Sequence, residues 1–157
     1  MSNPRPQEVI TKLMQLLRNN ITDLNKERKN RGGQWIWDDF PRLDATTPRI
    51  GIQLVTSPWQ SGGVGNQKII KCRIQITVMM RVKEKYDIDG DGAAEHTEDC
   101  IDYLANEVLD VIHRNNDEFK TIDGVIHVTP LGQPRAIRNA NNIFRYIDVE
   151  AEMERIV

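Results

Sequence analysis

The sequence is poor in the residues that build disulfide, zinc and nucleotide sites. Of its 157 residues only two are cysteines, Cys72 and Cys100, and neither stands in a CxxC or Cys/His spacing. This argues against a disulfide framework or a structural zinc, and it favours two buried thiols in a reducing compartment. No G-x-x-x-x-G-K-[ST] or G-x-G-x-x-G lies between an expected strand and an expected helix, so nucleotide binding has no support.

Long apolar runs and basic-aromatic stripes are also missing. No run approaches the roughly 20 apolar residues that a membrane-spanning helix needs, and the first residues, MSNPRPQEV, lack the apolar core of a signal peptide. Only nine residues are aromatic, and they do not interleave with Lys and Arg in the way that grips nucleic acid. We therefore expect no membrane contact and no specific binding of nucleic acid.

The usual catalytic groupings are absent from the sequence. None of the three histidines has a ligand-type partner four residues away apart from His96, which lies inside an acidic stretch, and no serine stands in a nucleophile elbow. Asp87, Asp89 and Asp91 could hold the Mg²⁺ of a hydrolase or nuclease, but no lysine or histidine is placed as a base. We expect a protein that is not an enzyme.

The composition that remains is that of one globular domain spanning residues 1–157. Hydrophobic residues make up 39% and charged residues 28% of the chain, and the formal net charge is -2. That small value hides an asymmetry. Residues 1–31 carry seven Lys/Arg against three Asp/Glu, whereas residues 84–123 carry three against thirteen.

The most regular stretch is KIIKCRIQITVMMRVK, residues 68–83. From Ile70 to Val82 every second residue is apolar, and mostly polar or basic residues stand between them. A period of two predicts a strand with one dry and one wet face. At roughly 3.3 Å per residue it would span about 50 Å, whereas a domain of this length has a radius of gyration of about 15 Å. The strand must bend or project, and a projecting strand points to assembly with a partner.

The elements around this strand predict an α+β fold. Apolar residues at helical spacing predict helices over residues 6–28 and 101–112, and alternation predicts strands over residues 50–55, 125–129 and 143–156. The order helix-strand-strand-helix-strand-strand favours two helices packed on one face of a mostly antiparallel sheet with a long projecting hairpin. The last strand carries a row of acids on its polar face. It should therefore lie antiparallel beside the basic strand, at about 0.2 to 1 kcal/mol per opposed charge pair.

Two aromatic segments have expected roles. We expect Trp35, Trp37 and Phe40 to anchor the core. The segment SPWQSGGVGNQ, residues 57–67, has three glycines that favour a mobile tip over a tight two-residue turn. Two interpretations of it remain open: a floppy hairpin loop, or a loop that orders against a partner with Trp59 as anchor.

One stretch carries a chemical motif, the calcium-loop pattern D-x-[DN]-x-[DN]-G-x5-E. Carboxylates from alternate residues of a tight turn can surround a cation that takes six to eight oxygens, with a backbone carbonyl added and a bidentate glutamate last. The predicted Ca²⁺ ligands are Asp87, Asp89, Asp91, the carbonyl of Ala93, Glu95 and Glu98. Tyr86 ends a strand, so the entering helix of an EF-hand is missing. A single structural site and an acidic turn that caps the following helix both remain open.

The overall plan resembles the tail terminator and tail-completion proteins of long-tailed viruses. The resemblance lies in the element order, the P-R-I-x-I strand at residues 48–52, the long basic strand and the acidic last strand. It implies a structural virion protein without catalytic residues, assembled in the host cytoplasm and located at the neck. Such proteins form rings, usually of six copies, that join the tail tube protein to a head-side connector or adaptor, and DNA passes through. The implied contact elements are residues 57–67, 129–142 and the projecting part of residues 68–83. The alternative is a stand-alone calcium-binding module.

Overall fold

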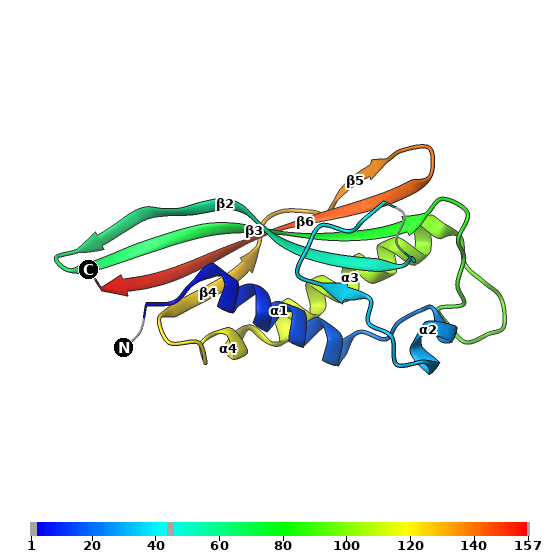
Figure 1. Ribbon diagram of the computed structural model, residues 1–157, viewed down its shortest axis with the longest axis horizontal. Coiled ribbons are helices and arrows are strands. Elements are labelled where there is room, and N and C mark those ends of the chain that lie inside the picture. The colour runs from blue at the N-terminus through cyan, green and yellow to red at the C-terminus, as the bar shows by residue number, and fades with distance from the viewer. Residues whose placement is uncertain (1–2, 44–45, 157) are drawn as a thin grey trace.

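A twisted six-stranded sheet with helices packed against it makes up the protein in the computed structural model, which describes residues 3–43 and 46–156 (Figure 1). The elements follow the order α1 (Pro6–Asn20), α2 (Lys26–Asn30), β1 (Ile36–Trp37), β2 (Arg49–Val64), β3 (Gln67–Arg81), α3 (Thr97–Arg114), α4 (Asn116–Phe119), β4 (Val125–Pro130), β5 (Arg135–Arg138) and β6 (Asn142–Ile156). The strand order is β1-β2-β3-β6-β4, with β5 also paired to β6. Every pairing is antiparallel except β1 with β2. The predicted α+β class is confirmed.

The basic strand and the acidic strand are neighbours, as their charges predicted. β3 pairs antiparallel with β6 along its whole length, and the register sets Lys71 opposite Glu152 and Arg73 opposite Glu150. The Lys71 ammonium lies 3.4 Å from the carboxylate of Glu150, diagonally across the two strands. The apolar face of β6 fixes this register, because a slip by one residue would turn that face toward water. The cross-strand pairs of opposite charge add to it.

The buried core lies between the sheet and the long helices. Ile50, Ile74, Ile76 and Val149 of the sheet are fully buried in one cluster with apolar residues of α1 and α3. A second, smaller cluster contains Met79 and Phe144, which pair across β3 and β6, with Tyr146 against them. β3 is therefore buried on both faces from Ile76 to Met80, whereas its first half keeps a partly exposed face that includes Arg73.

The strands β2, β3 and β6 extend beyond the helix layer as a three-stranded projection (Figure 1). We call this projection the arm, formed by residues 56–70 and 154–156; Cys72, Ala151 and Met153 next to it belong to the buried core. The predicted mobile tip is wrong, since β2 continues to Val64 and pairs with Gln67 across a two-residue turn. Gly65 occupies the first turn position at φ 61°, where a type II′ turn takes glycine. The glycine-rich segment is thus mostly strand.

The predicted helix over residues 6–28 is also wrong, because it is two helices. α1 ends at Asn20, and Ile21 has extended φ and ψ of -114° and 126°. The Asp23 carboxylate accepts a hydrogen bond from the backbone N–H of Asn25, and the Asn25 side chain accepts one from the N–H of Arg28 and so caps α2. Short polar side chains of this kind compete with the helical backbone and favour caps.

The prediction that three aromatic residues anchor the core is only partly confirmed. Trp35 is buried, whereas Trp37 and Phe40 are exposed. Trp37 instead lies beneath the guanidinium groups of Arg18 and Arg49, at 5.1 and 5.7 Å from its ring centre. Three further elements were not predicted. β1 forms at residues 36–37, β5 arises inside the polar connection, and α4 follows the second long helix directly.

Candidate functional site

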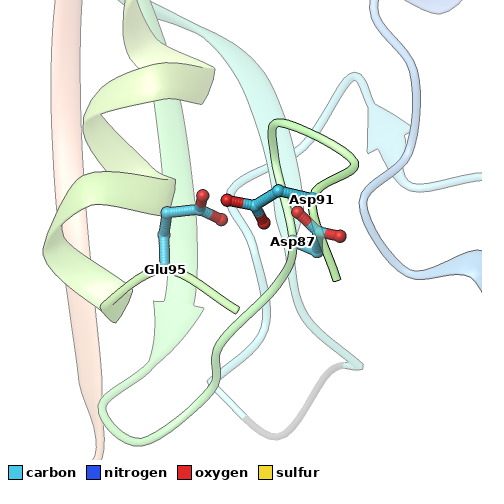
Figure 2. Close-up of side chains that lie close together, drawn as sticks. All are labelled: Asp87, Asp91 and Glu95. Atoms are coloured by element: carbon cyan, nitrogen blue, oxygen red, sulfur yellow. The ribbon is translucent and has the colours of Figure 1, made fainter. Parts of the chain in front are cut away.

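The acidic loop between β3 and α3 closes on itself. The backbone N–H of Glu95 donates to the carbonyl of Tyr86 at 2.9 Å, so the two ends of the loop lie side by side. Asp87, Asp91 and Glu95 point toward one another, and one carboxylate oxygen of each lies within 4.8 Å of the others (Figure 2). This cluster could hold a metal ion.

Backbone hydrogen bonds fix the first carboxylate of the cluster. The Asp87 carboxylate accepts from the N–H groups of Gly90 and Gly92, each at 2.9 Å. These bonds, chiefly the one from Gly92, hold the pKa of Asp87 below its ordinary value. Gly90 and Gly92 have φ of 76° and 88°, a region that only glycine enters without strain. The turn therefore presents Asp87 as an ionised group.

Glu95 acts chiefly on Asp89, the second acidic residue of the calcium-loop pattern. A hydrogen bond with Glu95, followed by the negative charge of Glu95, raises the pKa of exposed Asp89. Glu95 is itself held in place, because the backbone N–H of Ile88 donates to its carboxylate at 2.7 Å. A bound cation would relieve this repulsion between carboxylates.

Glu98 does not join the cluster, although the sequence pattern assigns it the closing position. Its carboxylate accepts from the Arg145 guanidinium at 2.7 Å and lies 3.4 Å from Arg138. Asp102 binds the same Arg145 at 2.7 Å. Of the six predicted ligands the structure brings together Asp87, Asp91 and Glu95. Asp89 lies beside Glu95, and the N–H of Ala93 donates to the Asp91 carboxylate at 2.9 Å.

The sequence held one signal for the position of Glu98. Arg145 falls between Ile143 and Ile147 on the apolar face of the last strand, where a cation needs a partner. Glu98 and Asp102 lie four residues apart on α3, so their side chains share one face of the helix. Both can therefore reach Arg145.

The arm carries a second surface of interest. Register places Trp59 beside Lys71 and Val64 beside Gln67, which in turn faces Ile156. The apolar side chains Trp59, Val64 and Ile156 are all exposed, and Val64 is 85% exposed. Exposed apolar groups on a projecting element are typical of contact surfaces.

Both edges of the arm are blunted against strand addition. Three register shifts interrupt the pairing of β2 between Leu54 and Gly62, and Pro58 lies among them. At the other edge the Asn3 side chain donates to the carbonyl of Ile156 and accepts from its N–H, at 3.2 and 3.0 Å. Bulges, proline and capped ends are the devices that prevent edge-to-edge aggregation. The faces of the arm are therefore its available contact surfaces.

Comparisons with known proteins give no family: no protein-family model matches the chain, and no curated protein matches it. Among residues 3–43 and 46–156, no helix combines the length and apolarity needed to cross a bilayer.

Proposed function

We propose that the protein is a ring-forming structural subunit of the tail terminator or tail-completion type, located at the head-tail neck of a long-tailed virus. The observation that carries the proposal is the arm, a three-stranded extension that projects beyond the helices (Figure 1). The outer part of the arm, residues 59–67, is exposed along its length, so contact with a partner would bury surface that the chain itself leaves open. Exposed Trp59, Val64 and Ile156 supply the apolar part of such a contact.

The proposed partners follow from this role. Copies of the chain contact one another in a ring, of six copies by the resemblance described above. The tail tube protein and a head-side connector or adaptor contact the two faces of the ring. DNA passes through the ring without specific binding. The faces of the arm make part of these contacts, since its edges are blunted by Pro58 and by Asn3.

Assembly of the purified chain tests the proposal. Light scattering and electron microscopy should find rings in solution or at the ends of purified tail tubes. A variant in which Asn-Gly replaces residues 61–69 keeps Gln60 opposite Ile70 and should fold with a shortened arm. It should melt cooperatively yet fail to cap tubes. A chain that stays monomeric alone and with tubes would contradict the proposal.

We further propose that Asp87, Asp91 and Glu95 bind Ca²⁺ and stiffen the connection between β3 and α3. The three converging carboxylates favour this role, because hard oxygen ligands suit calcium. The site has a structural role in the ring subunit, or it belongs to a stand-alone calcium-binding module if the chain stays monomeric.

Thermal unfolding decides the calcium proposal. A ligand that binds only the folded state raises the unfolding free energy by about 2.7 kcal/mol at one hundred times its dissociation constant. Millimolar Ca²⁺ should therefore raise the midpoint relative to a chelator, and Mg²⁺ should act less. An unchanged midpoint at millimolar Ca²⁺ would rule out the site.

A further inference from the structure

A cationic groove crosses the end of the sheet at which β3 finishes and β6 begins. Three adjoining hollows of about 420, 390 and 460 Å³ form it, and neighbouring hollows share lining residues. Four cations line these hollows: Arg81, Lys83, Lys85 and Arg138. Exposed Leu43 lines one end. The groove therefore joins a positive wall to an apolar end.

The positive charge of the groove is only partly neutralised. Glu98, the one carboxylate of the lining, is already engaged by Arg138 and Arg145. Lys83 and Lys85 are exposed and form no ion pair with any residue that the structure describes. A groove of this charge suits an acidic occupant.

A matching acidic stripe lies on the side of α3 away from the sheet, with Asp110 exposed and Tyr103 and Glu107 half-buried. Tyr103, Glu107 and Asp110 are spaced by four and three residues, so they form one stripe on the helix. The opposite face of α3, with Ile101, Leu104 and Val108, is buried against the sheet. Within the described chain neither Glu107 nor Asp110 has an ion pair. The surrounding residues 97–123 hold eight Asp/Glu against two Lys/Arg.

This stripe cannot fill the groove of its own chain. Thr97 lines the groove, and Glu107 and Asp110 follow it by ten and thirteen residues on the same helix. At 1.5 Å of rise per residue they lie about 15 to 20 Å from it along the helix axis. Packing of Leu104 and Val108 against the sheet holds the helix there.

We propose that the groove of one copy binds the acidic α3 stripe of a second copy, an inference that rests on the proposed ring. Groove and stripe are different surfaces, so each copy uses one of each. Repeated from copy to copy, such a head-to-tail contact forms a ring when the rotation between neighbouring copies adds up to one full turn. Opposite charges steer the encounter and fix its orientation, and Leu43 and Tyr103 add apolar and aromatic area.

Charge reversal tests the contact. The groove variant is Lys83→Glu with Lys85→Glu, and the stripe variant is Glu107→Lys with Asp110→Lys. Each alone should raise the dissociation constant of the ring at least about tenfold, since like charges then meet. Mixed in equal amounts, the two should restore wild-type assemblies in which the variants alternate. The matched control, Lys26→Glu with Lys29→Glu on exposed α2, should assemble as wild type.

Native mass spectrometry and light scattering at low and high salt give the readout, with circular dichroism to show that each variant folds. Assembly by the groove variant at wild-type concentrations, or a mixture that stays dissociated, would overturn the inference while leaving the ring intact. A wild-type chain that never assembles would overturn the proposed function and this contact together. If the wild-type chain binds a DNA duplex, and the groove variant loses that binding yet still assembles, the groove would instead bind nucleic acid.

Discussion

The guanidinium of Arg28 and the carboxylate of Asp23 form a two-pronged ion pair, with Nε to Oδ2 at 2.6 Å and Nη2 to Oδ1 at 2.8 Å. Their side chains are only 8% and 5% exposed. The remaining donors of Arg28 bind the backbone carbonyls of Thr46 and Pro48 at 3.0 and 2.6 Å. This one side chain therefore ties α2 to the start of β2.

Removal of the Asp23 carboxylate should strongly destabilise the folded protein. We expect Asp23→Asn to lower the free energy of unfolding by about 3 to 5 kcal/mol, because it leaves a buried guanidinium without its counter-charge. Urea unfolding followed by tryptophan fluorescence measures this. Lys29→Ala, on exposed α2, should change it by less than about 0.5 kcal/mol. Equal effects of the two substitutions would show that the pair contributes little.

Two adjacent glycines at the arm tip should respond differently to alanine. A Cβ on Gly63 would lie 2.2 Å from the carbonyl oxygen of Gln67, and its φ is 134°. A Cβ on Gly62 would meet nothing within 4 Å. Gly63→Ala should therefore open the tip, seen as faster amide exchange over residues 60–70, while Gly62→Ala should not. Global stability should change little in either case, since the tip lies outside the core.

The structure and the sequence motif differ on the calcium ligands, and substitution separates them. Glu95→Gln should abolish stabilisation by Ca²⁺, because it removes one of the three clustered carboxylates. Glu98→Gln should leave the calcium affinity unchanged and lower stability in chelator by about 1 to 3 kcal/mol, since Arg145 loses a charged partner. Calorimetric titration and thermal melts give both quantities. Loss of calcium binding in Glu98→Gln would favour the motif over the structure.

Asp89 should make the metal-free protein less stable as the pH rises. Its folded-state pKa is raised above the ordinary value of 3.8 by Glu95, so folding favours the protonated form. Stability is therefore lost between that ordinary value and the raised one. Asp89→Asn removes this loss, so it should melt above wild type at pH 7 in chelator and match it below about pH 3.5.

The reference for this comparison is Asp123→Asn, an exposed substitution in a different turn. It should follow the wild-type pH profile throughout. A lower melting point for Asp89→Asn at neutral pH would mean that Asp89 stabilises the loop rather than straining it.

The central strands could be predicted because two independent patterns agreed on them. Alternation from Ile70 to Val82 gave the strand, and the facing charges of Lys71 and Glu152 gave its neighbour. Periodicity could not find the break after Asn20, because Ile21 and Leu24 continue the helical spacing of α1. The buried ion pair of Asp23 with Arg28, whose guanidinium also binds the carbonyls of Thr46 and Pro48, holds the conformation there.

Local sequence patterns were also insufficient at the arm tip and in the acidic loop. Three glycines favoured a mobile tip, yet pairing with β3 holds most of that segment as strand. The loop motif gave the residues that converge, Asp87, Asp91 and Glu95, but it could not show that Arg145 draws Glu98 away. Local patterns record spacing, whereas a long-range partner decides which of several spaced groups meet.

The position of β6 in the sheet means that the sheet cannot be completed until the end of the described chain has been synthesised. It follows the other nine elements in the chain, yet it lies inside the sheet between β3 on one side and β4 and β5 on the other. The sheet can therefore close only after all ten elements have left the ribosome, and most of its contacts join distant parts of the chain, which slows folding. A chain that lacks β6 therefore has no finished arm and no strand to join β3 to β4 and β5.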